Sequence, residues 1–491
     1  MTTKRTRFWA LSAASLALAL SGCMGAGGSI PSASAPITQT EAQQGAQYHP
    51  QLVAEFGGEV QGPLADYVER IGKDMVVQSG NSRDSFNVSL LDSSINNAFA
   101  VPGGYIYSTR QLISLMDNEA ELAAVMGHEV GHVVARHSAR RQARAQRNTI
   151  LGGLGAILSS VFLGNSEIGN VLTRGALQAP QFLTLAHSRE QEEEADRLGI
   201  DYISGGGYDP RAMATLLERL AAQVELDARL QGRENARPPV WASTHPEPVA
   251  RVRLANAYAS DKPGNILNRD RFLSQIDGMI YGDNPRQGVI EGNAFIHPDL
   301  RLTFEAPQGY YMINSTRAVS VNGQGGQAQL TLAPYNGDLD SYVRQQFREV
   351  GGENNSLAPQ SIERTTVNGL RAAYGTARAN NNGSQVDVVI FAYEFASDRA
   401  YHFMAVTPAG RSNTFGSMFQ SMRRISASEA AQVIPRVIDV VTVQRGDTVS
   451  GLARRMAFDT AREERFRVLN GLGPNDGLIA GRKVKLVVRG R

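Results

Sequence analysis

Two histidines four residues apart, with a glutamate directly after the first, are the side chains of this sequence best suited to chemistry. They are His128, Glu129 and His132. On a helix, positions i and i+4 share one face, so both imidazoles can reach one metal ion. Two imidazoles and a carboxylate are the usual protein ligands of a catalytic zinc, and a nearby carboxylate can move the proton of an attacking water. The pattern predicts zinc-dependent hydrolysis of peptide bonds.

A second segment, residues 188–204, supplies the acidic candidates. It reads as a helix that ends at three consecutive glycines, 205–207. Glu192 and Asp196 lie four residues apart and share a face of that helix. We expect Glu192 to be the third zinc ligand. Asp196 is expected to hydrogen-bond the far nitrogen of a ligating histidine and so fix its tautomer. The other acids of this run are expected to be solvated.

The first motif needs a helix, and its flanking residues predict one. Asn118 suits the N-cap position, and Glu121 follows three residues later. The stretch that follows is largely apolar, which predicts a buried helix whose histidines need partners. The alternative is a surface helix with two solvated histidines. His137 and His187 fit neither ligand spacing and are expected to be structural.

Four blocks of sequence resemble the HtpX and CAAX-prenyl-protease family of gluzincin metallopeptidases. They are residues 97–107, 119–137, 188–196 and 243–251. The resemblance covers about residues 45–260 and is strongest to the soluble periplasmic, BepA-like members, because no transmembrane helices flank the catalytic helix. It implies a mainly helical zinc-peptidase domain with a small sheet, and one Zn²⁺ per chain.

The resemblance also implies roles that spacing alone does not. His245 would lie near the zinc, where it would stabilise the oxyanion of the tetrahedral intermediate or occupy the fourth zinc position and shut the enzyme off. Arg251 would hold the oxyanion or a substrate carbonyl. Without the resemblance, His245 is a loop histidine and Arg251 a helix-surface arginine. A strand that includes Asn97, Ala98 and Phe99 would edge the cleft and pair with an extended substrate.

The N-terminal residues predict export and a lipid anchor. Residues 1–22 start with basic side chains and continue in an apolar run too short to span a membrane stably. Cys23 is the only cysteine, and the residues before it resemble a bacterial lipobox, which predicts its lipidation. Met24, rather than Asp, follows this cysteine, and the resemblance to bacterial lipoproteins then implies the outer membrane of a Gram-negative bacterium. The alternative is a cytosolic protein with an unusual apolar N-terminus.

Charge excludes one class of partner. Removal of residues 1–22 takes away three positive charges and moves the formal net charge from +2 to −1. A nearly neutral chain lacks the basic surface that nucleic-acid binding requires. No segment after residue 22 has the length and apolarity of a membrane span.

The 491 residues suggest about three domains and an α+β multidomain fold. An α+β domain of unknown role is expected at 290–428, with an antiparallel sheet and two helices. The apolar insertion 150–163 reads as a buried hairpin, a membrane-touching lip or a substrate flap. The predicted units are a signal peptide (1–22), a flexible tether (23–46), a metallopeptidase domain (47–260), the α+β domain (290–428) and a small C-terminal domain (440–488).

Residues 440–488 resemble a LysM module, which implies a βααβ fold and binding of N-acetylglucosamine-containing glycans such as peptidoglycan. The stretch 457–467 is charged and departs from the LysM pattern. A module kept only for protein contact is the alternative.

Together these features predict a lipid-anchored periplasmic zinc endopeptidase in envelope quality control. The resemblance implies that its partners are misfolded or stalled envelope proteins, including outer-membrane proteins. One alternative is a latched peptidase that acts mainly as an envelope chaperone or scaffold. Another is an amidase of cell-wall peptides. A glycoside hydrolase is disfavoured, because that chemistry calls for a carboxylate pair without zinc.

Overall fold

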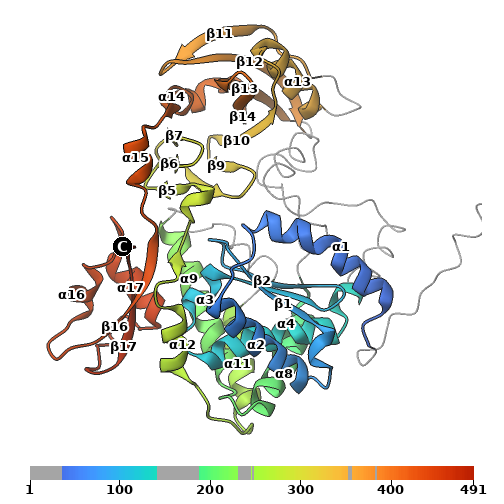
Figure 1. Ribbon diagram of the computed structural model, residues 1–491, viewed down its shortest axis with the longest axis vertical. Coiled ribbons are helices and arrows are strands. Elements are labelled where there is room, and N and C mark those ends of the chain that lie inside the picture. Colours follow the sequence, from blue (N-terminus) through green and yellow to red (C-terminus); the bar gives the residue numbers. More distant parts are fainter. Residues whose placement is uncertain are drawn as a thin grey trace, which may run out of the picture.

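The computed structural model describes residues 36–140, 187–230, 245, 248–351, 357–381 and 384–490. These residues form a helical unit with a small sheet, an antiparallel-sheet unit and a small C-terminal unit (Figure 1), which confirms the predicted α+β multidomain fold. Residues 1–22, Cys23 and the insertion 150–163 lie outside the described residues. Among the described helices, none combines the length and apolar character needed to cross a membrane.

The first unit packs helices around a three-stranded sheet. The strands are β1 (Asn87–Leu91), β2 (Ala98–Val101) and β3 (Tyr105–Thr109). The helices are α1 (Gln39–Glu55), α2 (Pro63–Gln78), α3 (Arg110–Leu115), α4 (Glu119–Val134), α8 (Arg189–Gly205), α9 (Ala212–Leu230), α11 (Pro248–Ala259) and α12 (Arg269–Ile276), with a 3₁₀ turn at Arg83–Ser85. The sheet order is β1-β3-β2, with β1 parallel and β2 antiparallel to β3. This places β2 at the edge of the sheet, against α4.

Capping side chains set where the two motif helices begin. The Asn118 side chain accepts a hydrogen bond from the Glu121 backbone N–H at 3.0 Å and starts α4. Ser188 and Gln191 form a capping box that starts α8. Both starts agree with the sequence. Helix α1 begins inside the predicted tether 23–46, because Thr38 forms a capping box of its own.

Helices α4 and α8 cross through glycines, which brings their backbones close. A Cβ atom added at Gly127 would lie 3.2 Å from the Gly199 carbonyl oxygen. One added at Gly131 would lie 3.2 Å from the Ala195 carbonyl oxygen and 3.3 Å from the Leu198 Cβ. Such distances are shorter than ordinary van der Waals contacts, so the glycines allow the two ligand-bearing helices to approach each other more closely than larger side chains would.

The second unit is built on a seven-stranded antiparallel sheet in the order β11-β12-β13-β14-β10-β9-β8, and a four-stranded sheet in the order β15-β7-β6-β5 lies beside it. Helix α13 covers one face of the large sheet, and α14 with β7 covers the other. Its elements are β5 (Val289–Glu291), β6 (Ala294–His297), β7 (Leu302–Glu305), β8 (Tyr311–Asn314), β9 (Val319–Gly323), β10 (Gly326–Pro334), α13 (Leu339–Gly351), β11 (Ile362–Val367), β12 (Leu370–Asn381), β13 (Ser384–Ala396), β14 (Arg399–Pro408), α14 (Gly416–Ser421), β15 (Arg423–Arg424) and α15 (Ala427–Ala431), with 3₁₀ turns at Pro285–Gln287 and Ser412–Phe415.

The C-terminal unit has the predicted βααβ order and is joined to the first unit. Its elements are β16 (Arg436–Thr442), α16 (Val449–Ala453), α17 (Arg462–Asn470) and β17 (Lys483–Arg489). A strand from the connection after α12, β4 (Ile280–Tyr281), pairs with β16 and completes a sheet in the order β17-β16-β4. Buried side chains such as Phe466 and Leu486 belong to the same apolar core as α2, α4 and α9. The two units therefore share one interior.

Candidate metal centre

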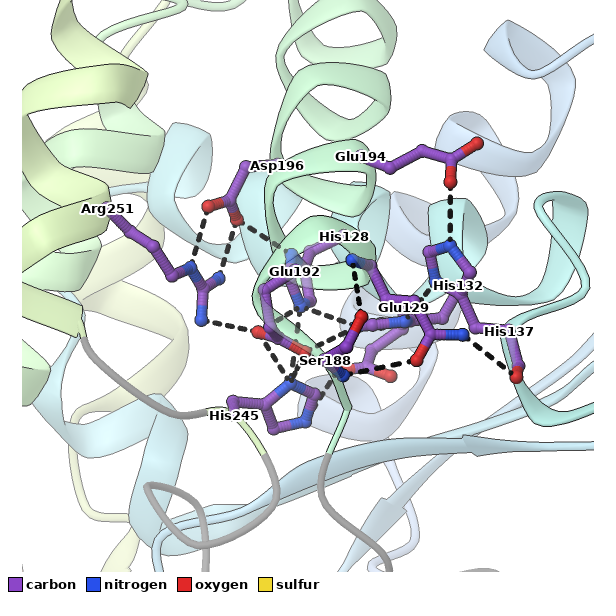
Figure 2. Close-up of polar contacts among 11 residues, drawn as sticks. His128, Glu129, His132, His137, Ser188, Glu192, Glu194, Asp196, His245 and Arg251 are labelled. Atoms are coloured by element: carbon purple, nitrogen blue, oxygen red, sulfur yellow. Dashed lines mark hydrogen bonds and ion pairs between the residues drawn. The ribbon is translucent and has the colours of Figure 1, made fainter. Parts of the chain in front are cut away.

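Four buried side chains from three parts of the chain bring ligand atoms together. They are His128 and His132 of α4, Glu192 of α8, and His245, and their ligand atoms all lie within 4.8 Å of one another. The Nε2 atoms of His128 and His132 are 2.9 Å apart. The His132 Nε2 atom is 3.3 Å from a Glu192 oxygen, and the His128 Nε2 atom is 3.7 Å from the other. Figure 2 shows these side chains pointing toward one another.

The charge states of these groups suit a divalent cation. Burial and the neighbouring His128 hold the pKa of His132 well below its usual value, so its imidazole is neutral. Burial alone would raise the pKa of Glu192, but His245 and Arg251 lower it well below the usual range, so it is a carboxylate. Neutral imidazoles and a carboxylate, held in a small buried space, match the nitrogen and oxygen ligands that zinc takes in peptidases. The residues present therefore fit a zinc ion.

Glu129 is buried directly beside this cluster. Burial raises the pKa of its carboxyl group above the usual value, and His245 and His128 partly oppose that rise. Its Oε1 atom lies 3.7 Å from the His245 Nε2 atom. A carboxyl group whose pKa is raised is suited to accepting and returning a proton.

Asp196 and Arg251 contact two of the expected ligands, His128 and Glu192. The Nδ1 atom of His128 is 2.9 Å from an Asp196 oxygen, as expected for a carboxylate that fixes a histidine tautomer. The Arg251 guanidinium donates to both Asp196 oxygens at 2.7 and 2.6 Å, and its Nη1 atom is 2.5 Å from a Glu192 oxygen. The described contacts of Arg251 thus join the third ligand to the residue that orients the first.

The second histidine ligand is oriented by a residue that spacing did not reveal. The His132 Nδ1 atom is 2.7 Å from the His137 Nδ1 atom, and the His137 Nε2 atom is 3.2 Å from Glu194. Arg140 also donates to Glu194, at 2.9 Å. With His137 donating to Glu194, its Nδ1 atom can accept from His132, which leaves the His132 Nε2 atom free to bind metal.

His187, also expected to be structural, stacks on the His132 ring with the ring centroids 4.0 Å apart.

His245 is already inside the ligand cluster. Its Nδ1 atom lies 3.1 and 3.2 Å from the two Glu192 oxygens and 3.4 Å from the His128 Nε2 atom. Burial would lower the pKa of His245, but Glu192 and Glu129 raise it above the usual value. This placement is compatible with both roles that the sequence left open for this histidine.

Among the described strands, the predicted substrate strand β2 lies at the edge of the small sheet. Its edge position comes from the order β1-β3-β2. The Asn97 carbonyl accepts hydrogen bonds from the backbone N–H and the hydroxyl of Thr109, both at 3.0 Å. Ala98 is buried, and Phe99 stacks on Tyr107 with the ring centroids 4.8 Å apart. Asn97 and Phe99 therefore fix the strand in place. Its unpaired backbone edge remains the predicted contact for a substrate.

Two segments of the chain match known families. Residues 64–259 match peptidase family M48, and residues 441–487 match the LysM domain. Both resemblances predicted from the sequence are therefore confirmed.

Curated relatives of the first segment carry the names of proteases. A Beta-barrel assembly-enhancing protease from Yersinia pestis is 34% identical over 214 residues, and one from Escherichia coli strain K12 is 32% identical over 213 residues. Each alignment covers 43% of this chain and 42% of the relative. The Mitochondrial metalloendopeptidase OMA1 of Schizosaccharomyces pombe is 30% identical over 194 residues, which is 39% of this chain and 52% of that protein. The chain thus spans less than half the length of the bacterial relatives it matches.

Proposed function

From the premise that residues 64–259 form a metallopeptidase domain of peptidase family M48, we propose that the chain is a zinc endopeptidase that cleaves misfolded or stalled proteins of the cell envelope. The observation that carries this proposal is the buried cluster of His128, His132 and Glu192 with Glu129 beside it. The names of the bacterial relatives support a substrate class that includes outer-membrane β-barrel proteins.

The side chains of the site have distinct tasks in peptide hydrolysis. Zinc, when bound, supplies a Lewis acid that polarises the scissile carbonyl and makes water a better nucleophile. Glu129 removes a proton from the attacking water and later delivers it to the leaving amine. Asp196 and His137 hold the two imidazoles so that each Nε2 atom faces the site, and Arg251 holds the carboxylate of Glu192.

The edge of β2 that pairs with no other described strand is the proposed place for an extended substrate. A peptide that adds to this edge as a further strand would run beside α4, which packs against β2 and carries Glu129. Main-chain hydrogen bonds bind peptides with little regard for their side chains, which suits an enzyme that acts on unfolded proteins.

The location of the chain is part of the same proposal. We place it in the periplasm, anchored to the outer membrane through lipid on Cys23, with the LysM domain binding the glycan of the cell wall. The bacterial relatives support the periplasm, and the N-terminal sequence supports the anchor.

One observation favours a second candidate, a latched enzyme that holds unfolded chains and seldom cleaves them. The Nδ1 atom of His245 lies within 3.4 Å of both Glu192 and His128, where it is positioned to compete with substrate or water for the metal. In this reading His245 leaves the site before hydrolysis begins.

The test is cleavage of an unfolded outer-membrane protein by the purified chain from residue 25 onward, beside Glu129→Gln, with zinc content measured for both. We expect the wild type to cleave about 10³-fold faster than Glu129→Gln at equal zinc content, because Glu129 moves the proton and does not bind the metal. No cleavage by zinc-loaded wild type would contradict an unlatched peptidase. Recovery of cleavage in His245→Ala would then identify the latch.

A further inference from the structure

A cavity of about 530 Å³ opens at the seam between the metallopeptidase and LysM domains. One wall is the start of α12 and the other is the start of β17. The lining residues are Asn268, Arg269, Asp270, Arg271, Gly481, Arg482 and Lys483. The cavity therefore exists only because these two domains are packed together.

The walls of this seam cavity are fixed relative to each other. Arg269 donates to both oxygens of Asp117, at 2.7 and 2.8 Å, and to the Lys483 carbonyl at 2.8 Å. Asp117 is buried, which raises the pKa of its carboxyl group, but hydrogen bonds from Arg269 and the positive charge of Lys485 outweigh burial and lower it. A ligand would meet a preformed site and would lose little affinity to ordering it.

The lining of the seam cavity is positively charged. It holds four cationic side chains and one acid, Asp270, which is 75% exposed. The side chains of Arg271, Arg482 and Lys483 are 56, 44 and 37% exposed. Their ion pairs are long: 3.8 Å from Arg271 to Glu119, 3.4 Å from Arg482 to Asp117, and 3.5 Å from Lys483 to Asp270.

Cationic donors remain available for a ligand. Among the described residues, the Arg271 guanidinium has a 3.8 Å ion pair with Glu119 and lies 5.7 Å from the centre of the Tyr67 ring, and the Lys483 ammonium has a 3.5 Å ion pair with Asp270. An arginine carries five N–H donors in a planar fork that matches a carboxylate, and a lysine carries three. The chemistry of the seam cavity is therefore that of an anion site with room for more than a single ion.

The neighbouring loop indicates which anion. Gly481 to Lys483 continue directly from the loop before β17, where Ile479 is 64% exposed. This loop belongs to the LysM domain, for which we propose glycan binding. A glycan strand held at this loop would lie next to the seam cavity, and the peptides attached to wall glycan end in carboxylates.

We propose that the seam cavity binds the carboxylates of a peptide-bearing glycan, so that the LysM and metallopeptidase domains hold one acidic strand jointly. This rests on the proposed glycan binding by the LysM domain. It adds that α12 of the metallopeptidase domain takes part in recognition and that the preferred ligand is acidic.

The test compares two soluble probes by calorimetry with the chain from residue 25 onward. One is a neutral N-acetylglucosamine tetramer, and the other is a disaccharide–tetrapeptide from peptidoglycan. We expect the wild type to prefer the acidic probe. The variant Arg271→Gln/Lys483→Gln should lose about tenfold in affinity for it and bind the neutral tetramer unchanged, because only the carboxylate partners are removed.

Arg455→Gln is the matched control. Arg455 is 51% exposed and has a 3.8 Å ion pair, to Asp439, on the same LysM domain but outside the cavity. This control should bind both probes like the wild type. The conservative variant Arg271→Lys, which keeps the charge, should retain most of the affinity for the acidic probe and shows that the site tolerates substitution.

Three results would overturn the proposal. The first is equal affinity of wild type and double variant for the acidic probe, which leaves the neutral-glycan binding of the proposed function intact. The second is binding of neither probe by the wild type, which removes glycan binding as well. The third is competition by vesicles containing phosphatidylglycerol that depends on Arg271 and Lys483, which would assign the seam cavity to a membrane surface.

Discussion

Arg251 links two buried carboxylates of the candidate metal centre. Its guanidinium joins Asp196, which orients His128, to Glu192, the expected third ligand. All of these groups are buried. A buried ion pair contributes little by itself, but the removal of one partner leaves a charge without compensation.

Arg251→Met should therefore lower the free energy of unfolding of the metal-free chain by about 3–5 kcal/mol, because two buried carboxylates lose their cation. Urea unfolding monitored by circular dichroism measures this. Arg253→Met, an exposed position on the same helix, is the control and should change little. A variant with wild-type stability and zinc content but a reduced kcat would instead support the oxyanion role that the resemblance implied for Arg251.

At the scale of single residues, the sequence indicated the expected metal ligands more readily than the residues that hold those ligands in position. The spacing of His128 and His132 follows from helix geometry alone. The contact of His132 with His137 depends on the turn after α4, where Arg136 adopts a left-handed φ of 57°. No periodic pattern encodes that turn. Since Arg251 reaches Asp196 only through the packing of α11 on α8, its contacts were equally hidden.

Among the elements, the crossing of α4 and α8 sets the distance between histidine and glutamate ligands. The glycines at the crossing are poor helix formers, and alanine at each would favour the isolated helix by about 1 kcal/mol. Close approach of the two helices is thus gained at some expense of helix propensity.

Gly131→Ala tests this balance. The added Cβ would lie 3.2 Å from the Ala195 carbonyl oxygen, so α8 must shift by a few tenths of an ångström. We expect zinc affinity to fall about tenfold while thermal stability changes by only a few degrees, because the gain in helix propensity offsets the strain. Competition with a chelator measures the affinity.

Gly477→Ala, where an added Cβ meets nothing within 4 Å, is the control. If Gly131→Ala kept the zinc affinity of the wild type, the helices could separate without moving Glu192, and the crossing would be only a packing feature.

Several helices and strands with a clear signal were predicted from the sequence, and others were missed. A cap identified the start of α4, the segment that ends at three glycines indicated α8, and the sequence pattern indicated β13 and β14. The hairpin of β11 and β12 was not predicted. Strand β11 is exposed over most of its length, so its side chains do not alternate between apolar and polar. Its place at the edge of the large sheet explains why it needs no such pattern.

At the scale of the whole molecule, the LysM and metallopeptidase domains share one apolar core. Lys485 is fully buried, and its Nζ atom donates to the Ser114 and Met116 carbonyls at 2.7 and 2.5 Å. These carbonyls lie just before α4. The sequence could not predict this, because a lysine in a strand near the end of the chain is normally a solvated residue.

Lys485 should make stability depend on pH. Burial lowers the pKa of its ammonium group from 10.5 to about 7 in the folded chain, although Asp117 partly opposes this. Between pH 7 and 10.5, Lys485 binds more protons in the unfolded chain than in the folded chain, so the free energy of unfolding rises with pH. The contribution of Lys485 to stability is therefore smallest below pH 7. The expected slope from this group approaches about 1.4 kcal/mol per pH unit.

Urea unfolding of wild type and Lys485→Met at pH 7, 8 and 9 measures that slope, since the other groups contribute about equally to both proteins. The wild-type curve should rise more steeply than that of the variant. Parallel curves for the two proteins would mean that Lys485 stays charged when folded, stabilised by the carbonyls and Asp117.

The contact between Lys485 and the segment before α4 also has a consequence for the order of synthesis. Ser114 and Lys485 are 371 residues apart, and β16 must emerge before β4 has a partner. Contacts over such separations form late, because the loop between them must first be closed. A nascent or truncated chain would carry the zinc-binding pentapeptide but not the strand that supports the segment before α4. The segment before α4 therefore gains this support only once β17 has been synthesised.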